Sequence, residues 1–155
     1  MDQDVGAQNL FVPSLAGIYR SLAPWGYAFI RFSAGAIVMY HGYAKLFTGF
    51  AGVVAERILT PMGFPAPLAC AYWLGILELF GAAMMAVGLF TRPIAFMLAV
   101  EMAIITFGWQ FKFGYFFSAQ GGGYEFPLLL MLVYIGIVFR GGGCYSLDRL
   151  LGKEF

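Results

Sequence analysis

Four mostly apolar stretches follow one another along the chain, and short breaks rich in polar residues, glycine or proline separate them. The stretches cover residues 24–47, 67–90, 93–111 and 124–139. A helix of about 20 residues, rising 1.5 Å per residue, crosses the hydrocarbon core of a bilayer. Only helices and closed barrels satisfy all their backbone hydrogen bonds in lipid. The pattern therefore predicts four transmembrane helices.

The breaks between the stretches indicate how these helices are arranged. Pro24, Pro67 and Pro93 stand at or near the starts of stretches, where the missing N–H of proline costs little. Only a short turn, "LFTRPI", separates the second stretch from the third, so these two helices must form an antiparallel hairpin. We therefore predict an all-α protein, an integral membrane four-helix bundle occupying residues 24–155.

A different pattern precedes the first apolar stretch, in residues 1–23. The opening "MDQDVGAQNL" is acidic and polar, unlike the positively charged start of a secretory signal. Leu15, Ile18 and Leu22 then recur at helical spacing. We expect an N-terminal arm that contains a short amphipathic helix lying at the membrane interface.

The composition supports the membrane assignment and excludes one class of partner. Of the 155 residues, 61% are hydrophobic and 11% are charged, whereas about 25% are charged in ordinary soluble domains. Too few polar residues are present to cover a soluble fold, so lipid is the expected surroundings. The net charge is +1 and no basic stripe is present, so we expect no binding to nucleic acid.

An even number of spans places both chain ends on the same side of the membrane. Lysine and arginine are enriched on cytoplasmic loops, and this bias sets the orientation. The terminal side carries more of these residues than the other side, which holds Lys45, Arg57 and Lys112. Cytoplasmic N and C termini are therefore expected. The basic residues assigned to the terminal side are Arg20, Arg92, Arg140, Arg149 and Lys153.

Ionisable residues inside the predicted spans are the most informative positions. A charge at mid-membrane costs about 2.5–3.5 kcal/mol, so Arg31, Glu78 and Glu101 cannot face lipid unpaired. At 100° per residue, Arg31, His41 and Lys45 fall within an arc of about 100° on the first span. We therefore expect a polar stripe that faces the interior of the bundle.

An interior polar network follows from this placement. Arg31 and Glu101 lie at matching depths, which predicts that they pair, with Glu78 as a further partner of Arg31. His41 and Lys45 are expected to meet Glu78 or Glu125. Such charges either hold helices together or exchange protons, and Glu78 and His41 are the candidates for proton exchange. The complete network comprises Arg31, His41, Lys45, Glu78, Glu101 and Glu125.

Several cofactor chemistries are excluded by the residue inventory. One histidine cannot provide two haem ligands, two cysteines cannot hold an iron–sulfur cluster, and no spacing suits a metal site. Nucleotide-binding and hydrolase motifs are absent. The aromatic segment "FGWQFKFGYFF" is either an interfacial belt or a contact surface for a quinone ring, through Trp109 and Tyr115. A non-covalently bound quinone is the one cofactor expected.

The order of several motifs resembles the DoxX family of small bacterial membrane proteins. These motifs are "RFSAGAIVMYHGYAKLF", "GFAGVVAERILTPMGFPAP", "LGILELFGAAMMAVGLFTR" and "GGGYEFPLLLMLVYIGIVFRGGGCYSLDRLL". The resemblance covers about Tyr27 to Leu151. Glu101 and the long N-terminal arm depart from the family pattern. Carried over by position, the family-type polar residues are Arg31, His41, Lys45, Glu78, Glu125 and Asp148.

The resemblance implies a multi-pass protein of the bacterial inner membrane, associated with redox systems. A related subunit belongs to thiosulfate:quinone oxidoreductase. We therefore expect an accessory or anchoring subunit of a quinone-linked redox or energy-converting complex, working with other membrane subunits and with a partner that carries haem or iron–sulfur centres. Two alternatives stay open: a purely structural assembly subunit, and a small-solute transporter. Catalysis by this chain alone is not expected.

Overall fold

A computed structural model describes residues 10–116 and 122–153, and every regular element in these ranges is helical. Residues 1–9 of the predicted arm and Gly121 of the "GGGYEF" motif lie outside the described residues. The α-helices are α1 (Ala16–Phe47), α2 (Phe50–Val54), α3 (Pro67–Ile76), α4 (Ala82–Val87), α5 (Thr91–Ala103), α6 (Glu125–Arg140) and α7 (Leu147–Leu150). Three π-helical segments interrupt or extend them: η3 (Ala55–Leu59), η4 (Leu77–Gly81) and η5 (Ile104–Gln110). Short 3₁₀ turns are η2 (Pro13–Leu15) and η6 (Phe111–Phe113).

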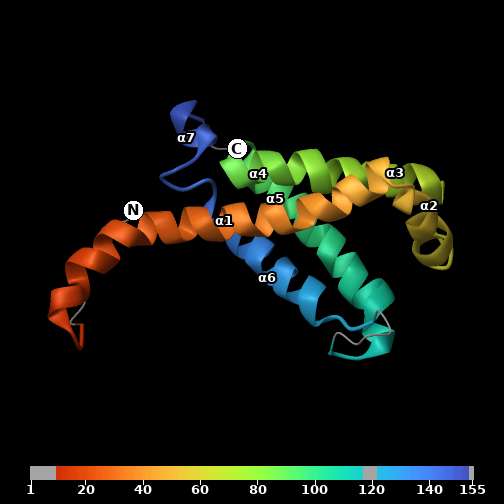
Figure 1. Cartoon of the computed structure of the whole chain (residues 1–155), viewed down its shortest axis with the longest axis horizontal. Helices are drawn as coiled ribbons and strands as arrows, with labels where there is room; N and C mark the ends of the chain where they lie inside the picture. Colours follow the sequence, from red (N-terminus) through yellow and green to blue (C-terminus); the bar gives the residue numbers. More distant parts are fainter. Residues whose placement is uncertain (1–9, 117–121, 154–155) are drawn as a thin grey trace.

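The long helices form two pairs. α1 lies along the continuous helix made by α3, η4 and α4, and α5 packs against α6 along its length. Figure 1 shows that the α5–α6 pair runs at an angle to the first pair. The two pairs are close together near the α4–α5 turn and diverge toward α2. This fork determines where the bundle is densely packed and where it is hollow.

The all-α membrane fold predicted from the sequence is confirmed. Three helical stretches in the described residues are long and apolar enough to cross a membrane: Pro13–Phe47, Pro67–Val87 and Thr91–Phe113. The fourth, α6, has 16 residues and is therefore about 24 Å long, shorter than the other three. The predicted hairpin turn is present, with Gly88 and Phe90 in the left-handed region.

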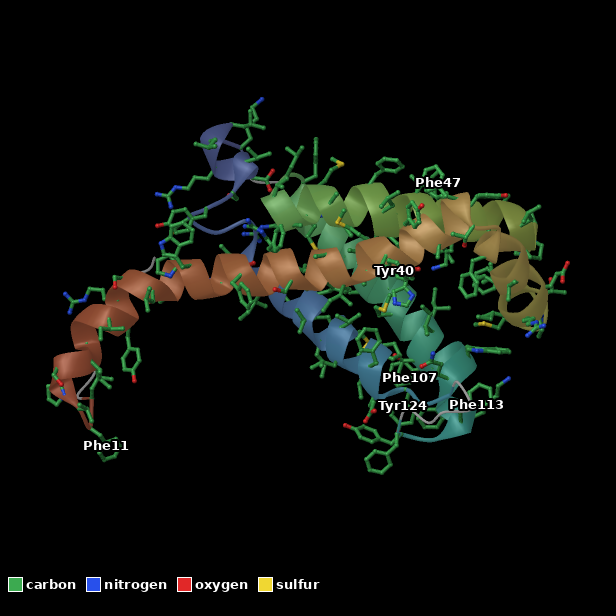
Figure 2. The ribbon with its side chains drawn as sticks, in the orientation of Figure 1. Phe11, Tyr40, Phe47, Phe107, Phe113 and Tyr124 are labelled. Carbon is green, nitrogen blue, oxygen red and sulfur yellow. The ribbon has the colours of Figure 1, made fainter. Side chains whose placement is uncertain are left out.

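The predicted interfacial helix is continuous with the first span. α1 begins at Ala16 and contains Pro24 in its interior instead of starting there. The helix bends away from the bundle on its N-terminal side, and Phe11 lies near the tip of this extension (Figure 2). A proline inside a helix removes one hydrogen bond and bends the axis, which accounts for a bend without a break.

Small residues let the helices of the first pair approach closely. A Cβ added to Gly42 of α1 would lie 2.4 Å from the backbone nitrogen of Leu79. A Cβ on Gly35 would lie 2.7 Å from the carbonyl oxygen of Ala82. The second pair is joined to α1 by Tyr134, whose buried hydroxyl donates to the Ala34 carbonyl oxygen at 3.0 Å. These contacts place α1 against η4, α4 and α6.

Large apolar side chains cover the outside of the bundle. Tyr40, Phe47 and Phe107 are all more than half exposed and point outward (Figure 2). Contiguous apolar surface of this kind is rare on soluble monomers and is expected where lipid is the solvent. The interior is therefore the place to look for chemistry.

Candidate functional site

A cavity of about 260 Å³ lies between the two helix pairs, on the side where they diverge. α1, α3 and α6 line it, together with the segment from Phe50 to Phe64 that covers it from one side. Its exposed lining residues include His41, Ile104 and Phe126, so the cavity reaches the lipid-facing surface. We call this part of the molecule the open end. The apolar wall includes Val54, Leu59, Met62, Leu74, Ile105 and Leu130.

Each π-helical segment contributes to this one cavity. η3 provides Ile58 and Leu59, η4 provides Glu78, and η5 provides Ile105 and several neighbours. A π-turn inserts an extra residue into the helical repeat and turns the following side chains around the axis. Such turns are uncommon and are frequent at functional sites. Three of them around one cavity favour a binding role for the space they enclose.

A buried ion pair forms the polar end of the cavity. The Lys45 ammonium of α1 donates to the Glu78 carboxylate of η4, and both side chains are less than a tenth exposed. Glu78 is one of the two partners that the sequence allowed for Lys45. Because the two charges neutralise each other, this pair can be tolerated at membrane depth. Gly42 and Gly75 supply the close helix contact that brings the two side chains together.

A second carboxyl group faces this pair. Glu101 of α5 is 4% exposed, lines the same cavity and interacts electrostatically with Glu78 and Lys45. Neither Glu101 oxygen receives a hydrogen bond from an N–H or hydroxyl donor among the described residues. Lys45, Glu78 and Glu101 therefore form one buried group of two carboxyls and one ammonium at the end of the cavity, which we call the carboxyl cluster.

The far wall of the cavity carries an aromatic ring and an amide from η5. Trp109 lines the cavity and is half-buried, and the Lys112 ammonium lies 3.7 Å from its ring centroid. The side-chain oxygen of Gln110, also in the lining, is buried without a donor in the described part of the chain. The cavity thus combines a flat aromatic wall with buried hydrogen-bond acceptors.

Three other predicted site residues lie apart from the carboxyl cluster. His41 is exposed at the cavity opening and has no hydrogen bond or ion pair with a described residue, so it is not the interior histidine expected. Glu125 begins α6 half-buried and does not line the cavity. Tyr115 is exposed and packs edge-on against Tyr124, outside the cavity. The turn at Gly114, with φ of 84°, directs the chain away before Tyr115.

The predicted pairing of Arg31 with Glu101 or Glu78 is wrong. Arg31 is 3% exposed, but its guanidinium donates to carbonyl oxygens: to Ala86 at 3.3 Å, to Tyr145 at 2.6 Å and to Gly142. The chain after α6 folds back over the end of the bundle, and its carbonyl oxygens reach Arg31 before any carboxylate does. Depth along a single helix did not reveal this returning segment.

Asp148 secures the same returning segment. Its carboxylate accepts from the backbone N–H groups of Phe90 and Thr91, at 2.8 and 3.0 Å, and from the Thr91 hydroxyl at 2.8 Å. A carboxylate at a helix N-terminus satisfies unpaired N–H groups and complements the helix dipole. Asp148 therefore caps α5 from the far end of the chain. We call this region, with Arg31, the α4–α5 turn and residues 141–150, the closed end.

Sequence reasoning missed two contributors to the site. The apolar spans predicted from the sequence leave out the segment 50–66, although it provides Phe50, Val54, Ile58, Leu59, Met62 and Phe64 to the cavity. Its apolar run "FAGVVAERIL" is a signal for a helical cover. Gln110 was also missed, although an amide in an apolar stretch is a detectable signal.

Comparison with known sequences identifies the family. The sequence pattern of the DoxX family matches residues 26–110, slightly more than half of the chain. The chain belongs to the DoxX family. The matched region contains α1 from residue 26 onward, the cavity cover, the continuous α3–α4 helix and α5, so it includes the whole carboxyl cluster. The DoxX region ends at the last residue of η5, before α6 and the closing segment.

A relative supports this assignment over a greater length. An uncharacterized protein of Haemophilus influenzae is 32% identical over 139 residues, covering 84% of this chain and 94% of the relative. No solved structure gives a significant match. The family membership therefore rests on sequence, and the arguments about the site rest on the geometry described above.

Proposed function

We propose that this DoxX protein is the quinone-binding accessory subunit of a membrane redox complex. The observation that carries the proposal is the cavity, which is apolar along its walls, opens toward lipid and ends in a buried group that can hold a proton. A quinone has the matching form: a flat ring, polar atoms at its edge and an apolar tail.

The size of the cavity supports a ring of this kind. An apolar cavity of about 150 Å³ in a protein core can hold benzene. At about 260 Å³, the cavity here has room for a six-membered ring with substituents. Trp109 provides a flat wall for stacking, and the exposed residues at the opening allow the tail to extend into lipid.

The carboxyl cluster supplies the protons in this proposal. Reduction of a quinone to a hydroquinone takes up two electrons and two protons, one proton on each oxygen. Lys45 would donate a hydrogen bond to one quinone oxygen, Glu101 would pass the proton it shares with Glu78, and the second proton would follow the same route after the cluster is recharged. Exposed His41 at the opening is the residue through which the cluster regains protons from water. This keeps the proton-exchange roles inferred for Glu78 and His41.

The electrons come from a partner subunit with a haem or iron–sulfur centre, and other membrane subunits and lipid complete the assembly. In the bacterial inner membrane, with cytoplasmic termini, the closed end faces the cytoplasm and the cavity lies in the outer half of the bilayer. The purely structural alternative has no use for a carboxyl cluster beside a ring-sized cavity, and four spans without inverted repeats do not favour the transporter alternative.

The test is to count the quinone retained by the protein after extraction from its native membrane in mild detergent. Wild-type protein is expected to retain a stoichiometric quinone by native mass spectrometry. Ile58→Trp fills the cavity from its cover segment and is expected to reduce retention at least about tenfold, because the ring site is occupied. Val53→Trp is the matched control on the exposed face of α2, and it should retain quinone normally.

Turnover of the assembled complex separates redox participation from scaffolding. Glu78→Gln keeps Glu101 as a carboxyl group beside Lys45, so the complex is expected to assemble, and quinone reduction should fall by about 10²–10⁴-fold, the usual size of a general acid–base contribution. Unchanged turnover with normal assembly would mean that the chain is a structural subunit. If the wild-type protein retained no quinone, with or without bound partner subunits, the proposal that the cavity binds quinone would be overturned.

A further inference from the structure

The buried polar atoms without partners in the cavity lining share one chemical character. They are the two Glu101 oxygens and the Gln110 side-chain oxygen, and all three are hydrogen-bond acceptors. Glu101 is 4% exposed and belongs to the cavity lining. Even when Glu101 shares a proton with Glu78, at least one of its oxygens has no donor among the described residues. A ligand that offers only carbonyl oxygens therefore cannot satisfy these buried acceptors, because a carbonyl oxygen donates no hydrogen bond.

From this excess of acceptors, resting on the proposed quinone site, we infer that the cavity prefers a ligand with hydroxyl donors: the hydroquinone form over the quinone form. A hydroquinone presents two O–H donors at opposite edges of its ring. A quinone presents two carbonyl acceptors at the same positions and offers no donor. Glu101 and Gln110 lie on α5 and on the adjoining η5, so one wall of the cavity presents both acceptors to the ring.

Water does not remove this preference. Water can donate to Glu101 and Gln110 in the empty cavity, but a ring that enters displaces it from a space of about 260 Å³. A ligand that brings its own donors restores those hydrogen bonds, and one without donors leaves buried acceptors unpaired. The ammonium donor of the carboxyl cluster, Lys45, is already engaged by Glu78. It can serve at most one end of a quinone.

The preference has a consequence for the direction of the proposed reaction. A site that binds the hydroquinone more tightly makes reduction of the bound quinone easier, because binding is linked to the redox equilibrium. The subunit is thereby matched to accepting electrons from its partner. Product release into lipid then becomes the slower step.

The test is to measure the affinity of purified protein for a short-chain ubiquinone and for the same compound reduced to its hydroquinone, by anaerobic calorimetry in the same detergent. The hydroquinone is expected to bind at least about tenfold more tightly, the effect of satisfying one buried acceptor. Equal binding, or tighter binding of the quinone, would overturn this inference and leave the quinone site in place. Binding of neither would overturn both proposals.

Variants locate the preference on the two acceptors. Gln110→Met removes one acceptor at similar volume and is expected to bring the ratio of the two affinities toward unity. Thr106→Val is the matched control, because Thr106 also has a buried unpaired oxygen on η5 but does not line the cavity. It should leave the ratio unchanged. A change in the ratio with Thr106→Val and none with Gln110→Met would contradict the assignment, and the wild-type ratio tests it even if Gln110→Met fails to fold.

Discussion

At the closed end of the bundle, Arg31 and Asp148 are buried, and nearly all of their hydrogen bonds are to the protein backbone. At the open end, the buried charged residues are grouped with one another: Lys45, Glu78 and Glu101. Arg31 donates to three carbonyl oxygens, and Asp148 accepts from two backbone N–H groups and one hydroxyl. Glu101 meets no such donor in the described residues. A charge bonded to backbone fixes the chain path, whereas a charge bonded to other charges can change partner or protonation state. Burial alone therefore does not show whether a charged side chain is structural or takes part in chemistry. The groups to which the side chain is bonded do show it.

The largest effect is expected from Arg31→Leu. This substitution leaves the carbonyl oxygens of Ala86, Gly142 and Tyr145 without their donor, at about 1–3 kcal/mol each. Little folded protein should be recovered by size-exclusion chromatography in detergent. Adding Glu101→Gln should give no rescue, because Arg31 does not pair with Glu101. Recovery of the double variant would show that the two ends share one charge network.

Lys45→Met is expected to destabilise the bundle by about 3 kcal/mol, because it leaves the buried Glu78 carboxylate without its cation. The double variant Lys45→Met with Glu78→Gln should recover most of that loss, since a neutral pair needs no charge partner. Unfolding in mixed detergent micelles measures both. A double variant as unstable as the single one would place this pair with the structural charges of the closed end.

Gly42→Ala sharpens the comparison by testing the packing beside the cavity. Its Cβ would meet the backbone of η4, which cannot move aside, so a loss of about 1–3 kcal/mol is expected. Gly136→Ala on α6 has open space around the new methyl group and should be neutral, or more stable by up to about 1 kcal/mol. Equal melting temperatures for the two variants would mean that the open end is loosely packed throughout.

The smallest and most direct comparison uses two threonines, Thr91 and Thr106, both with 0% exposure. The Thr91 hydroxyl donates to Asp148, whereas the Thr106 oxygen has no partner in the described part of the chain. Thr91→Val should therefore cost about 1 kcal/mol, and Thr106→Val should be neutral or stabilising by a similar amount. Opposite signs in thermal unfolding support the contrast between the ends. The same sign for both would remove it.

The sequence was sufficient for the fold because the signal for each long helix is local. Apolar length identified the spans, and the short "LFTRPI" turn identified the hairpin. Lys45 and Glu78 were also within reach, because each lies on the polar face of its own helix. Arg31 was misassigned because its partners are backbone carbonyls, which every residue carries and no sequence pattern marks.

The cavity was not predictable from periodicity for a related physical reason. A helical wheel assumes 100° per residue, and each π-turn breaks that count. After η4 and within η5, side chains therefore point in directions that the 100° repeat does not predict. The residues that line the cavity no longer fall on a single face of a regular helical wheel. Tyr115, the other residue expected to contact a quinone, lies outside this cavity because the turn at Gly114 takes the chain away.

The cap that Asp148 places on α5 also bears on how the protein is made. Thr91 and Asp148 are 57 residues apart in the chain, and α6 lies between them. At a synthesis rate of about 5–20 residues per second, roughly 3–11 s pass between the synthesis of Thr91 at the start of α5 and the synthesis of Asp148, which caps it. During this interval α5 enters the membrane with bare N–H groups, which water or the insertion machinery must satisfy. The cap on α5 can form only after α6 and the segment that carries Asp148 have been synthesised.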